Sequence, residues 1–369
     1  MGIKLINTDM LKNNRLAWVD YTRGIAIILV LYRHIFEGIS RTGLPTAEYS
    51  YLEHANIIFY SFRMPLFFIL SGIFIGKSLA KRPVGKLIAN KFSILLYPYF
   101  VWSILQVTLQ LVLSKYVNAD RHAADYAYIL FFPRRIDQFW YLYALFNVTV
   151  LYMLTREKLK LGIWQQLLLG AGMYLVSSYV TQKSIDLGFV YDILHYYIFF
   201  ALGDLLSARI LDQGNFSRFA SWKTFLLLLP VFVAGQFYFL TKNLEVNDNL
   251  YVEAWQPVLF AVIAVSGCAF MACIAFLLQR YNALRMLRVV GFHSLYIYVS
   301  HVLVASAVRL VLMKGLGVTN VPVLLVICLA AAIIIPIMIY NIAMHYGAWW
   351  LYSLEKPAGN GKTLAVQNA

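Results

Sequence analysis

The stretch WVDYTRGIAIILVLYRHIFEG, residues 18–38, determines how the rest of the chain is interpreted. It is long and apolar enough to span a bilayer as a helix. It nevertheless carries five ionisable side chains, namely Asp20, Arg23, Arg33, His34 and Glu37. Ionisable groups inside a membrane are costly, and they usually serve a function. The stretch therefore predicts a membrane protein with a polar site on its first helix.

The spacing within this stretch places its polar residues on one side. An α-helix turns about 100° per residue, so eleven steps bring Arg23 and His34 to within roughly 20° of one face, about 16 Å apart along the axis. Asp20 lies one turn before Arg23, and Glu37 lies one turn after His34. All four side chains are thus predicted to form one stripe. Two alternatives stay open. Arg23 could serve merely to reach lipid headgroups at the membrane interface, and His34 could serve merely to pack against neighbouring side chains.

The composition of the whole chain also indicates a membrane protein. Of 369 residues, 61% are hydrophobic and 13% are charged, whereas soluble domains contain about 45–50% apolar and about 25% charged residues. We therefore expect an all-α polytopic integral membrane protein with about ten transmembrane helices in a single domain, residues 1–369. The predicted spans are 18–40, 57–76, 92–114, 139–155, 161–180, 190–209, 222–241, 258–279, 289–313 and 321–353.

The distribution of charge predicts the orientation. If the N-terminus is inside, the cytoplasmic segments hold more than twice as many lysines and arginines as the outside segments, which fits the positive-inside rule. Residues 1–17 are then a cytoplasmic N-terminal segment, and 355–369 form a cytoplasmic tail. Most of the net charge of +14 is explained in this way. A nucleic-acid partner is not expected, because it would need clustered basic patches on a soluble surface.

The three cysteines indicate neither disulfides nor a metal. Cys268, Cys273 and Cys328 fall in apolar runs without the spacing of metal ligands. We expect them to be small residues of the core, and no metal cofactor is predicted.

Two further segments place polar side chains in predicted spans. SFRMPLFFILSG, residues 61–72, contains Arg63 near the predicted outer end of the second span, and Ser71 with Gly72 offers a small surface for close helix approach. HSLYIYVSH, residues 293–301, ends in His301. Arg63, Ser71 and His301 are candidate substrate-binding residues, and Arg63 or His301 could stabilise an oxyanion. The alternatives are an arginine at the lipid interface and a buried histidine that only packs.

Four segments of the chain resemble those of a known family. The first contains Arg23 and His34 and reads DYTRGIAIILVLYRH, and the others are MPLFFILSG, FWYLYALF and SLYIYVSH. Together they resemble the membrane acyltransferase-3 family, and in particular the branch described as fucose 4-O-acetylase-like or surface-polysaccharide O-acetyltransferases. The resemblance runs in order from about Ala17 to His301. It implies a multi-pass enzyme of the bacterial inner (cytoplasmic) membrane that transfers an acyl group, most often acetyl from acetyl-CoA. The implied acceptor is a hydroxyl of a cell-surface carbohydrate or lipid-linked sugar.

The resemblance and the predicted orientation together suggest a donor site. Arg23 is expected at the inner interface, where it would meet the phosphates of acyl-CoA, and Asp20 would hold its guanidinium. Lys77 and Arg82, in the next cytoplasmic loop, are further candidates for cofactor binding. That loop also contains Lys81, Lys86 and Lys91.

The same reasoning suggests a catalytic role deeper in the membrane. His34, near the bilayer midplane, is expected to act as general base on the acceptor hydroxyl, and Glu37 to orient or stabilise its imidazole. Transient acylation of His34 is the alternative chemistry. A transporter or flippase for a sugar or glycolipid is an alternative function that would use the same polar path. It predicts inverted repeats and broken helices, of which the sequence shows no sign. A structural or sensor membrane protein is the last alternative, and it predicts that Arg23 and His34 tolerate substitution.

Overall fold

The computed structural model describes residues 5–12, 16–112 and 121–356, and the regular elements in these ranges are all helices. Three parts of the predicted topology lie outside the described residues. They are the tail from residue 357 onwards, residues 1–4 and 13–15 of the N-terminal segment, and the end of the predicted span 92–114. The longer helices are α1 (Ala17–Ser40), α2 (Ser50–Gly72), α5 (Tyr97–Val112), α7 (Trp140–Glu157), α8 (Ile163–Gln182), α9 (Phe189–Ile210), α11 (Trp222–Val246), α13 (Pro257–Tyr281), α15 (Ser294–Leu310) and α16 (Val321–His345).

Shorter helices connect or cap these elements. The short α-helices are α3 (Ile75–Lys81), α4 (Val84–Lys91), α6 (Tyr128–Phe131), α10 (Phe216–Phe219), α12 (Tyr251–Trp255) and α14 (Arg285–Phe292). Short 3-10 segments are η1 (Asp9–Lys12), η2 (Thr46–Tyr49), η4 (Ala123–Ala127), η5 (Pro133–Phe139), η6 (Gln213–Asn215) and η8 (Trp349–Leu351). Two π-helical turns, η3 (Phe92–Leu96) and η7 (Val311–Gly315), continue longer helices. Such turns often occur near functional sites.

Each predicted span overlaps at least one helix, but only some of these helices are apolar enough to be candidate membrane spans. Among the described residues, seven helices are long and apolar enough to cross a membrane, so the chain is a multi-pass membrane protein. They cover Thr46–Lys81, Val84–Val112, Phe189–Ile210, Trp222–Val246, Pro257–Tyr281, Ser294–Gly315 and Val321–His345. The helices α1, α7 and α8 are not among these seven. Their crossing, the total of ten spans and the cytoplasmic termini stay predictions.

The boundaries of some spans differ from those predicted. Helix α2 begins at Ser50, inside the segment expected to be a loop. The predicted span 289–313 is two helices, because α14 ends at Phe292 and α15 begins at Ser294. The last helix ends at His345 and does not continue to residue 353, because Gly347 adopts a left-handed conformation with φ of 79°.

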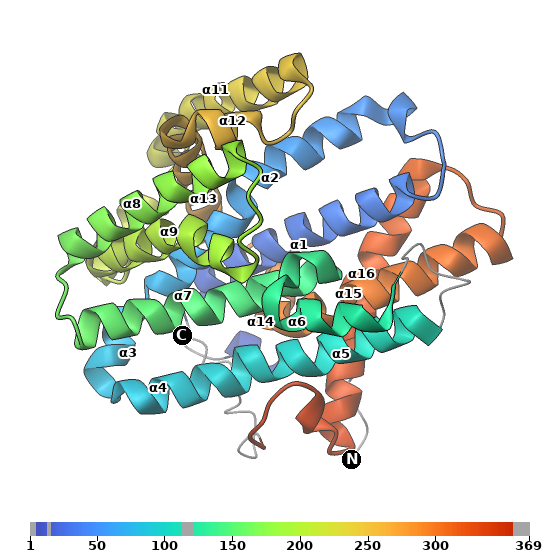
Figure 1. Cartoon of the computed structure of the whole chain (residues 1–369), viewed down its shortest axis with the longest axis horizontal. Coiled ribbons are helices and arrows are strands. Elements are labelled where there is room, and N and C mark those ends of the chain that lie inside the picture. Colours follow the sequence, from blue (N-terminus) through green and yellow to red (C-terminus); the bar gives the residue numbers. More distant parts are fainter. Residues whose placement is uncertain (1–4, 13–15, 113–120, 357–369) are drawn as a thin grey trace.

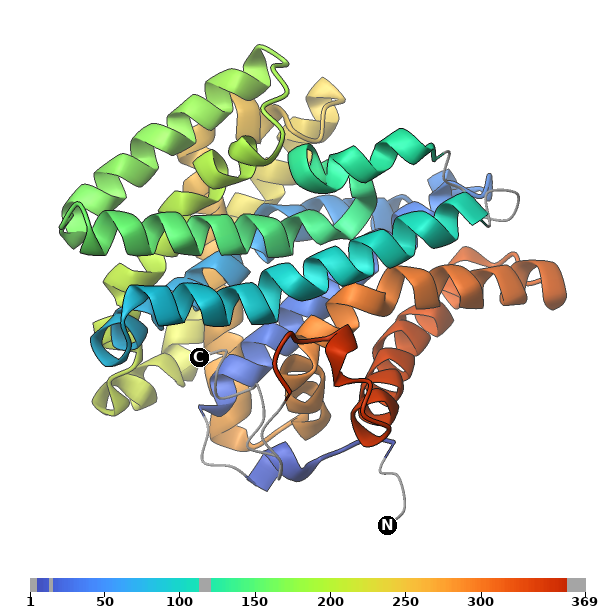
Figure 2. The same cartoon turned by 60° about the horizontal axis from the view of Figure 1, so that its bottom comes forward.

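Helix α1 packs against many of the other elements. It contacts α2, α13, α14, α15 and α16. In Figures 1 and 2, α8 and α9 lie on one side of α1, whereas α15 and α16 lie on the other. Within the polar stripe of α1, Asp20 is buried, and Arg23, His34 and Glu37 are partly buried.

Glycines let the backbones of α1 and α2 approach their neighbours closely. A Cβ atom at Gly291 of α14 would lie 1.7 Å from the backbone oxygen of Asp20, and one at Gly72 would lie 2.0 Å from that of Phe200 on α9. No side chain fits at either position, so the helices meet through their backbones. The predicted role of Gly72 in close helix approach is thus confirmed. These contacts fix the two helices that carry most of the predicted site.

Candidate active site

Two polar cavities lie at different levels of the same four helices, α1, α2, α7 and α15. The larger, which we call the His34 cavity, has a volume of about 280 Å³. The smaller, the Arg23 cavity, has a volume of about 80 Å³. The charged, polar and aromatic lining of the His34 cavity comprises Arg33, His34, Glu37, Arg41, Tyr60, Gln110, Arg134, Asp137, Trp140, His195, Tyr196, Glu253, Phe260, Ser306 and Arg309.

Aromatic side chains lie between the two cavities. Tyr141 and Tyr298 line the Arg23 cavity, whereas the neighbouring Trp140 lines the His34 cavity. The rings of Tyr141 and Tyr298 pack edge to face with centroids 5.4 Å apart. On α1, Ile27 lines one cavity and His34 the other. Because a helix rises 1.5 Å per residue, the two levels are separated by about 10 Å along α1.

His34 is paired with a second histidine. The ring of His301 lies 5.3 Å from that of His34, centroid to centroid. Nδ1 of His301 is 2.7 Å from the carbonyl oxygen of Tyr298, and a carbonyl can only accept, so Nδ1 carries the proton. Nε2 is then an acceptor, and it is buried without a hydrogen-bond partner among the described residues. The structure thus places the candidate substrate residue His301 beside the candidate base.

Glu37 lies in the same cavity but is bonded to another side chain. Its Oε1 accepts a hydrogen bond from Nε of Arg33 at 2.6 Å. The guanidinium of Arg33 also lies 5.9 Å from the ring centroid of Tyr60. Glu37 therefore holds Arg33 at the wall of the cavity. Its predicted action on the imidazole of His34 stays a prediction.

Like His301, the other two candidate substrate residues, Arg63 and Ser71, are not among the residues that line the His34 cavity. Arg63 is only 2% exposed, with its guanidinium 5.4 Å from the ring centroid of Tyr60 and 3.5 Å from Oδ1 of Asn56. It lies inside the protein, as a buried cation next to the cavity wall. Ser71 lines the Arg23 cavity instead, and its hydroxyl donates to the carbonyl of Phe67.

The candidate donor residues are also divided. Arg23 lines its cavity together with Lys91, the last residue of α4. Asp20 is buried one turn before Arg23. Lys77 and Arg82 are exposed on and after α3 and do not contribute to the lining. Among the basic residues of this loop, the structure therefore brings Lys91 to Arg23.

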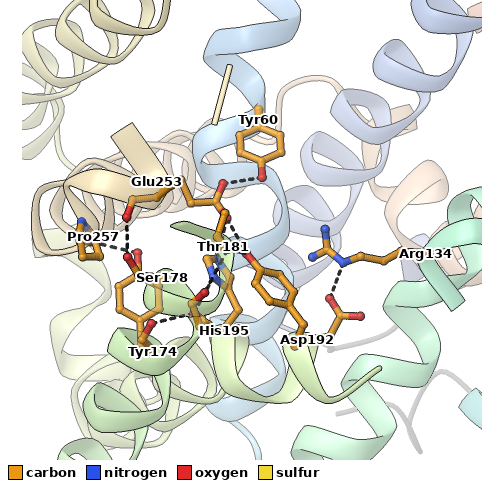
Figure 3. A network of polar contacts seen from close by, with 12 residues as sticks. Tyr60, Arg134, Tyr174, Ser178, Thr181, Asp192, His195, Glu253 and Pro257 are labelled. Carbon is orange, nitrogen blue, oxygen red and sulfur yellow. Dashed lines mark hydrogen bonds and ion pairs between the residues drawn. The ribbon is translucent and has the colours of Figure 1, made fainter. Parts of the chain in front are cut away.

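A buried polar cluster, shown in Figure 3, contributes Tyr60, His195 and Glu253 to the wall of the His34 cavity. The carboxyl of Glu253, on α12, accepts hydrogen bonds from the hydroxyls of Tyr60 at 2.5 Å and Tyr191 at 3.3 Å. Nε2 of His195 lies 3.4 Å from Oε1 of Glu253. Burial raises the pKa of the Glu253 carboxyl above its ordinary value, because the charged form is poorly solvated there.

The segment η5 supplies another edge of the cavity. Nε of Arg134 donates to Asp192 at 2.7 Å, and the guanidinium lies 4.3 Å from the ring centroid of Trp140. Asp137 has φ of 64° and ψ of −127°, a conformation that is costly for any residue other than glycine. The Asp137 carboxylate accepts hydrogen bonds from Gln106, Gln110 and Arg121. These three donors hold the strained backbone in place.

Comparison with known families identifies the chain. The family Acyl_transf_3, described as an acyltransferase domain, matches residues 16–341. The chain belongs to the acyltransferase-3 family. The matched region contains the four helices that line both cavities, and the predicted membership of the family is confirmed.

One relative of the chain is the nodulation protein NolL of Sinorhizobium fredii (strain NBRC 101917 / NGR234). The two are 25% identical over 204 residues, which are 55% of this chain and 52% of NolL. The chain thus spans about half the length of this relative. No solved structure matches the chain.

Some residues in the candidate site could not be singled out from the sequence. Glu253 is in a connecting segment, and His195 is at one end of a different helix. They meet because α12 packs against α8, and α8 packs against α9. The one signal was the presence of His195 and Asp192 inside an apolar run. Within the described ranges, no group of three or more His, Cys, Asp or Glu side chains is arranged to hold a metal ion.

Proposed function

We propose that this acyltransferase is a membrane-bound O-acyltransferase that moves an acetyl or other acyl group from cytoplasmic acyl-CoA to a hydroxyl of a cell-surface carbohydrate or lipid-linked sugar. One observation carries the proposal: the same four helices hold a basic cavity at one level and a histidine cavity at the next. An anionic thioester and a hydroxylic acceptor can therefore approach from different ends and meet between them.

The Arg23 cavity supports binding of the donor. Arg23 and Lys91 supply two cations for the phosphates of acyl-CoA. The remaining walls are largely apolar and include Ile27, Phe67 and Leu95, which suits the uncharged pantetheine arm. We infer that the thioester reaches the level of Tyr141 and Tyr298. The ring of Tyr298 lies 5.9 Å from that of His301, centroid to centroid, and so links this level to the pair of His34 and His301.

The His34 cavity supports the chemistry of acyl transfer. The neutral imidazole of His34 removes the proton of the acceptor hydroxyl as its oxygen attacks the thioester carbonyl carbon. The tetrahedral intermediate collapses, the carbon–sulfur bond breaks, and the thiolate takes the proton from the imidazolium. The products are the ester and the free thiol of coenzyme A. A general base of this kind contributes roughly 10²–10⁴-fold to the rate.

The walls of the His34 cavity suit a carbohydrate. Trp140, Tyr196 and Phe260 provide aromatic surface on which the apolar faces of a sugar ring can pack. Glu253 and Ser306 provide polar groups for its hydroxyls. A few polar groups on an aromatic wall are typical of small-molecule sites.

A genetic experiment tests the proposal without knowledge of the acceptor. Envelope glycans of a deletion strain are compared by mass spectrometry with those of strains that carry the wild-type gene or the His34→Ala variant. We expect wild type to restore an acetyl substituent and His34→Ala to leave it absent at equal protein level. The matched control is His345→Ala, which removes an exposed histidine at the end of α16. This variant should restore the acetyl substituent. Restoration by His34→Ala would refute the catalytic role of His34.

A second measurement distinguishes direct transfer from an acyl-enzyme. Purified protein is incubated with labelled acetyl-CoA in the absence of acceptor and then denatured. We expect no label on the protein if His34 acts as a general base. Label that is retained by wild type and lost in His34→Ala would instead establish an acyl-histidine intermediate.

A further inference from the structure

The His34 cavity contains arginines that its own acids do not neutralise. Most charged groups at its walls have a partner of opposite charge: Arg33 pairs with Glu37, Arg134 with Asp192, and Asp137 with Arg121. Glu253 is bonded to two tyrosines. Arg41 and Arg309 also line the cavity. Within the described part of the chain, neither has an ion pair or a hydrogen bond from its side chain.

These two arginines converge from different helices. Arg41 directly follows the last residue of α1, and Arg309 lies in the last turn of α15. Arg41 is exposed, whereas Arg309 is partly buried. Two like charges held close together are unfavourable unless an anion lies between them. Their position at one cavity therefore indicates a binding site for a negatively charged group.

A glycine makes room for Arg309 to reach this position. A Cβ atom at Gly38 would lie 2.1 Å from Nη1 of Arg309, so the guanidinium rests directly on the backbone of α1. Gly38 itself lines the His34 cavity, one turn beyond His34. Any larger residue at position 38 would displace the charged end of Arg309.

We propose that Arg41 and Arg309 form an anion-binding subsite of the His34 cavity, which takes a phosphate or carboxylate group of the acceptor. The inference rests on the proposed function and narrows it, because the acceptor is then an anionic or phosphate-linked sugar and not a neutral one. Guanidinium groups bind both kinds of anion through paired, charge-assisted hydrogen bonds. The guanidinium of Arg309 rests on Gly38, one helical turn from His34, and Arg41 lies about two turns from His34. This spacing places the anion near the hydroxyl that is acylated.

The proposal is tested by binding of radiolabelled inorganic pyrophosphate to purified protein in phosphatidylcholine nanodiscs. Saturating coenzyme A is present throughout, so that the donor cavity does not contribute. We expect saturable binding that is at least tenfold weaker in Arg309→Gln. Lys183→Gln, which removes an exposed charge after α8, should bind like wild type.

A second variant retains the charge and moves it. Gly38→Ala should weaken pyrophosphate binding by a similar factor, because its methyl group displaces the guanidinium of Arg309. The fold should persist, because the displaced atoms are the far end of a flexible side chain. Gly172→Ala, on α8, is the control, since a Cβ there meets no atom within 4 Å.

Three results would overturn the proposal. The first is the absence of saturable binding, and the second is unchanged binding in Arg309→Gln. The third is loss of binding when phosphatidylglycerol replaces phosphatidylcholine, because a lipid headgroup would then be the ligand. Failure of the proposed function would give a different result. His34→Ala would then still restore the acetyl substituent, while pyrophosphate binding would still depend on Arg309.

Discussion

At the scale of single residues, His301 is the side chain that changes how His34 is interpreted. The backbone carbonyl of Tyr298 fixes the proton of His301 on Nδ1, which leaves Nε2 as an acceptor next to the ring of His34. A neighbour of this kind can fix the tautomer of the base through one hydrogen bond. We therefore regard His301 as a positioning residue in the proposed mechanism.

Replacement of His301 tests this role. His301→Ala should lower kcat for acetyl transfer by roughly 10²-fold, with little change in KM for acetyl-CoA, because the donor cavity is untouched. His293→Ala removes another buried histidine, one that is bonded to Val289 in a different region, and it should leave kcat nearly unchanged. Equal kcat values in His301→Ala and wild type would exclude the positioning role.

Glu253 should make the stability of the protein depend on pH. Burial raises its pKa above the ordinary value of a glutamate carboxyl, so the folded state retains the proton that the unfolded state has lost. The carboxyl contributes its full stability below the unfolded pKa, and this contribution is lost as the pH rises through the folded pKa. Thermal unfolding in detergent should show Glu253→Gln becoming more stable relative to wild type as the pH rises through this range. A difference in stability between the variant and wild type that stays constant with pH would contradict this prediction.

At the scale of elements, close glycine contacts position the helices of the site. Gly291→Ala places a methyl group against the backbone of α1, which cannot move aside as a side chain can, so it should destabilise the fold by about 1–3 kcal/mol or more. Gly85→Ala adds the same group to α4, where no atom lies within 4 Å. It should be neutral or stabilise by up to about 1 kcal/mol. Thermal unfolding of the two variants side by side measures the difference, and equal midpoints would contradict the packing argument.

The helices were largely predictable from the sequence, whereas half of the site was not. Helix α1 matched its predicted range within one residue because an apolar run bounded by polar residues determines where a span ends. The break between α14 and α15 was missed, because His293 and its neighbours show no proline at that point. Arg23 and His34 share one helix, so their spacing was informative. Glu253, His195 and Tyr60 lie on three helices, and only tertiary packing brings them together.

At the scale of the whole molecule, the orientation in the membrane decides which cavity faces the cytoplasm. We expect the hairpin between α7 and α8 to be cytoplasmic and the connection after α8 to be outside. Lys158→Cys should then resist a membrane-impermeant maleimide in intact cells, and Lys183→Cys should react. The three native cysteines are buried, so the background is low. The opposite labelling pattern would show that the orientation is inverted. Equal labelling of both variants would show that α8 does not cross the membrane.

The succession of two cavities along α1 has an electrical consequence. In the proposed reaction an acyl group leaves the thiol on one side, and the hydroxyl proton from the other side replaces it on sulfur. Formally, one acyl cation is exchanged for one proton, so no net charge crosses the bilayer. Moving one charge would cost or release about 2.3 kcal/mol per 100 mV. Transfer should therefore proceed equally well in energised and depolarised cells, driven by the thioester alone.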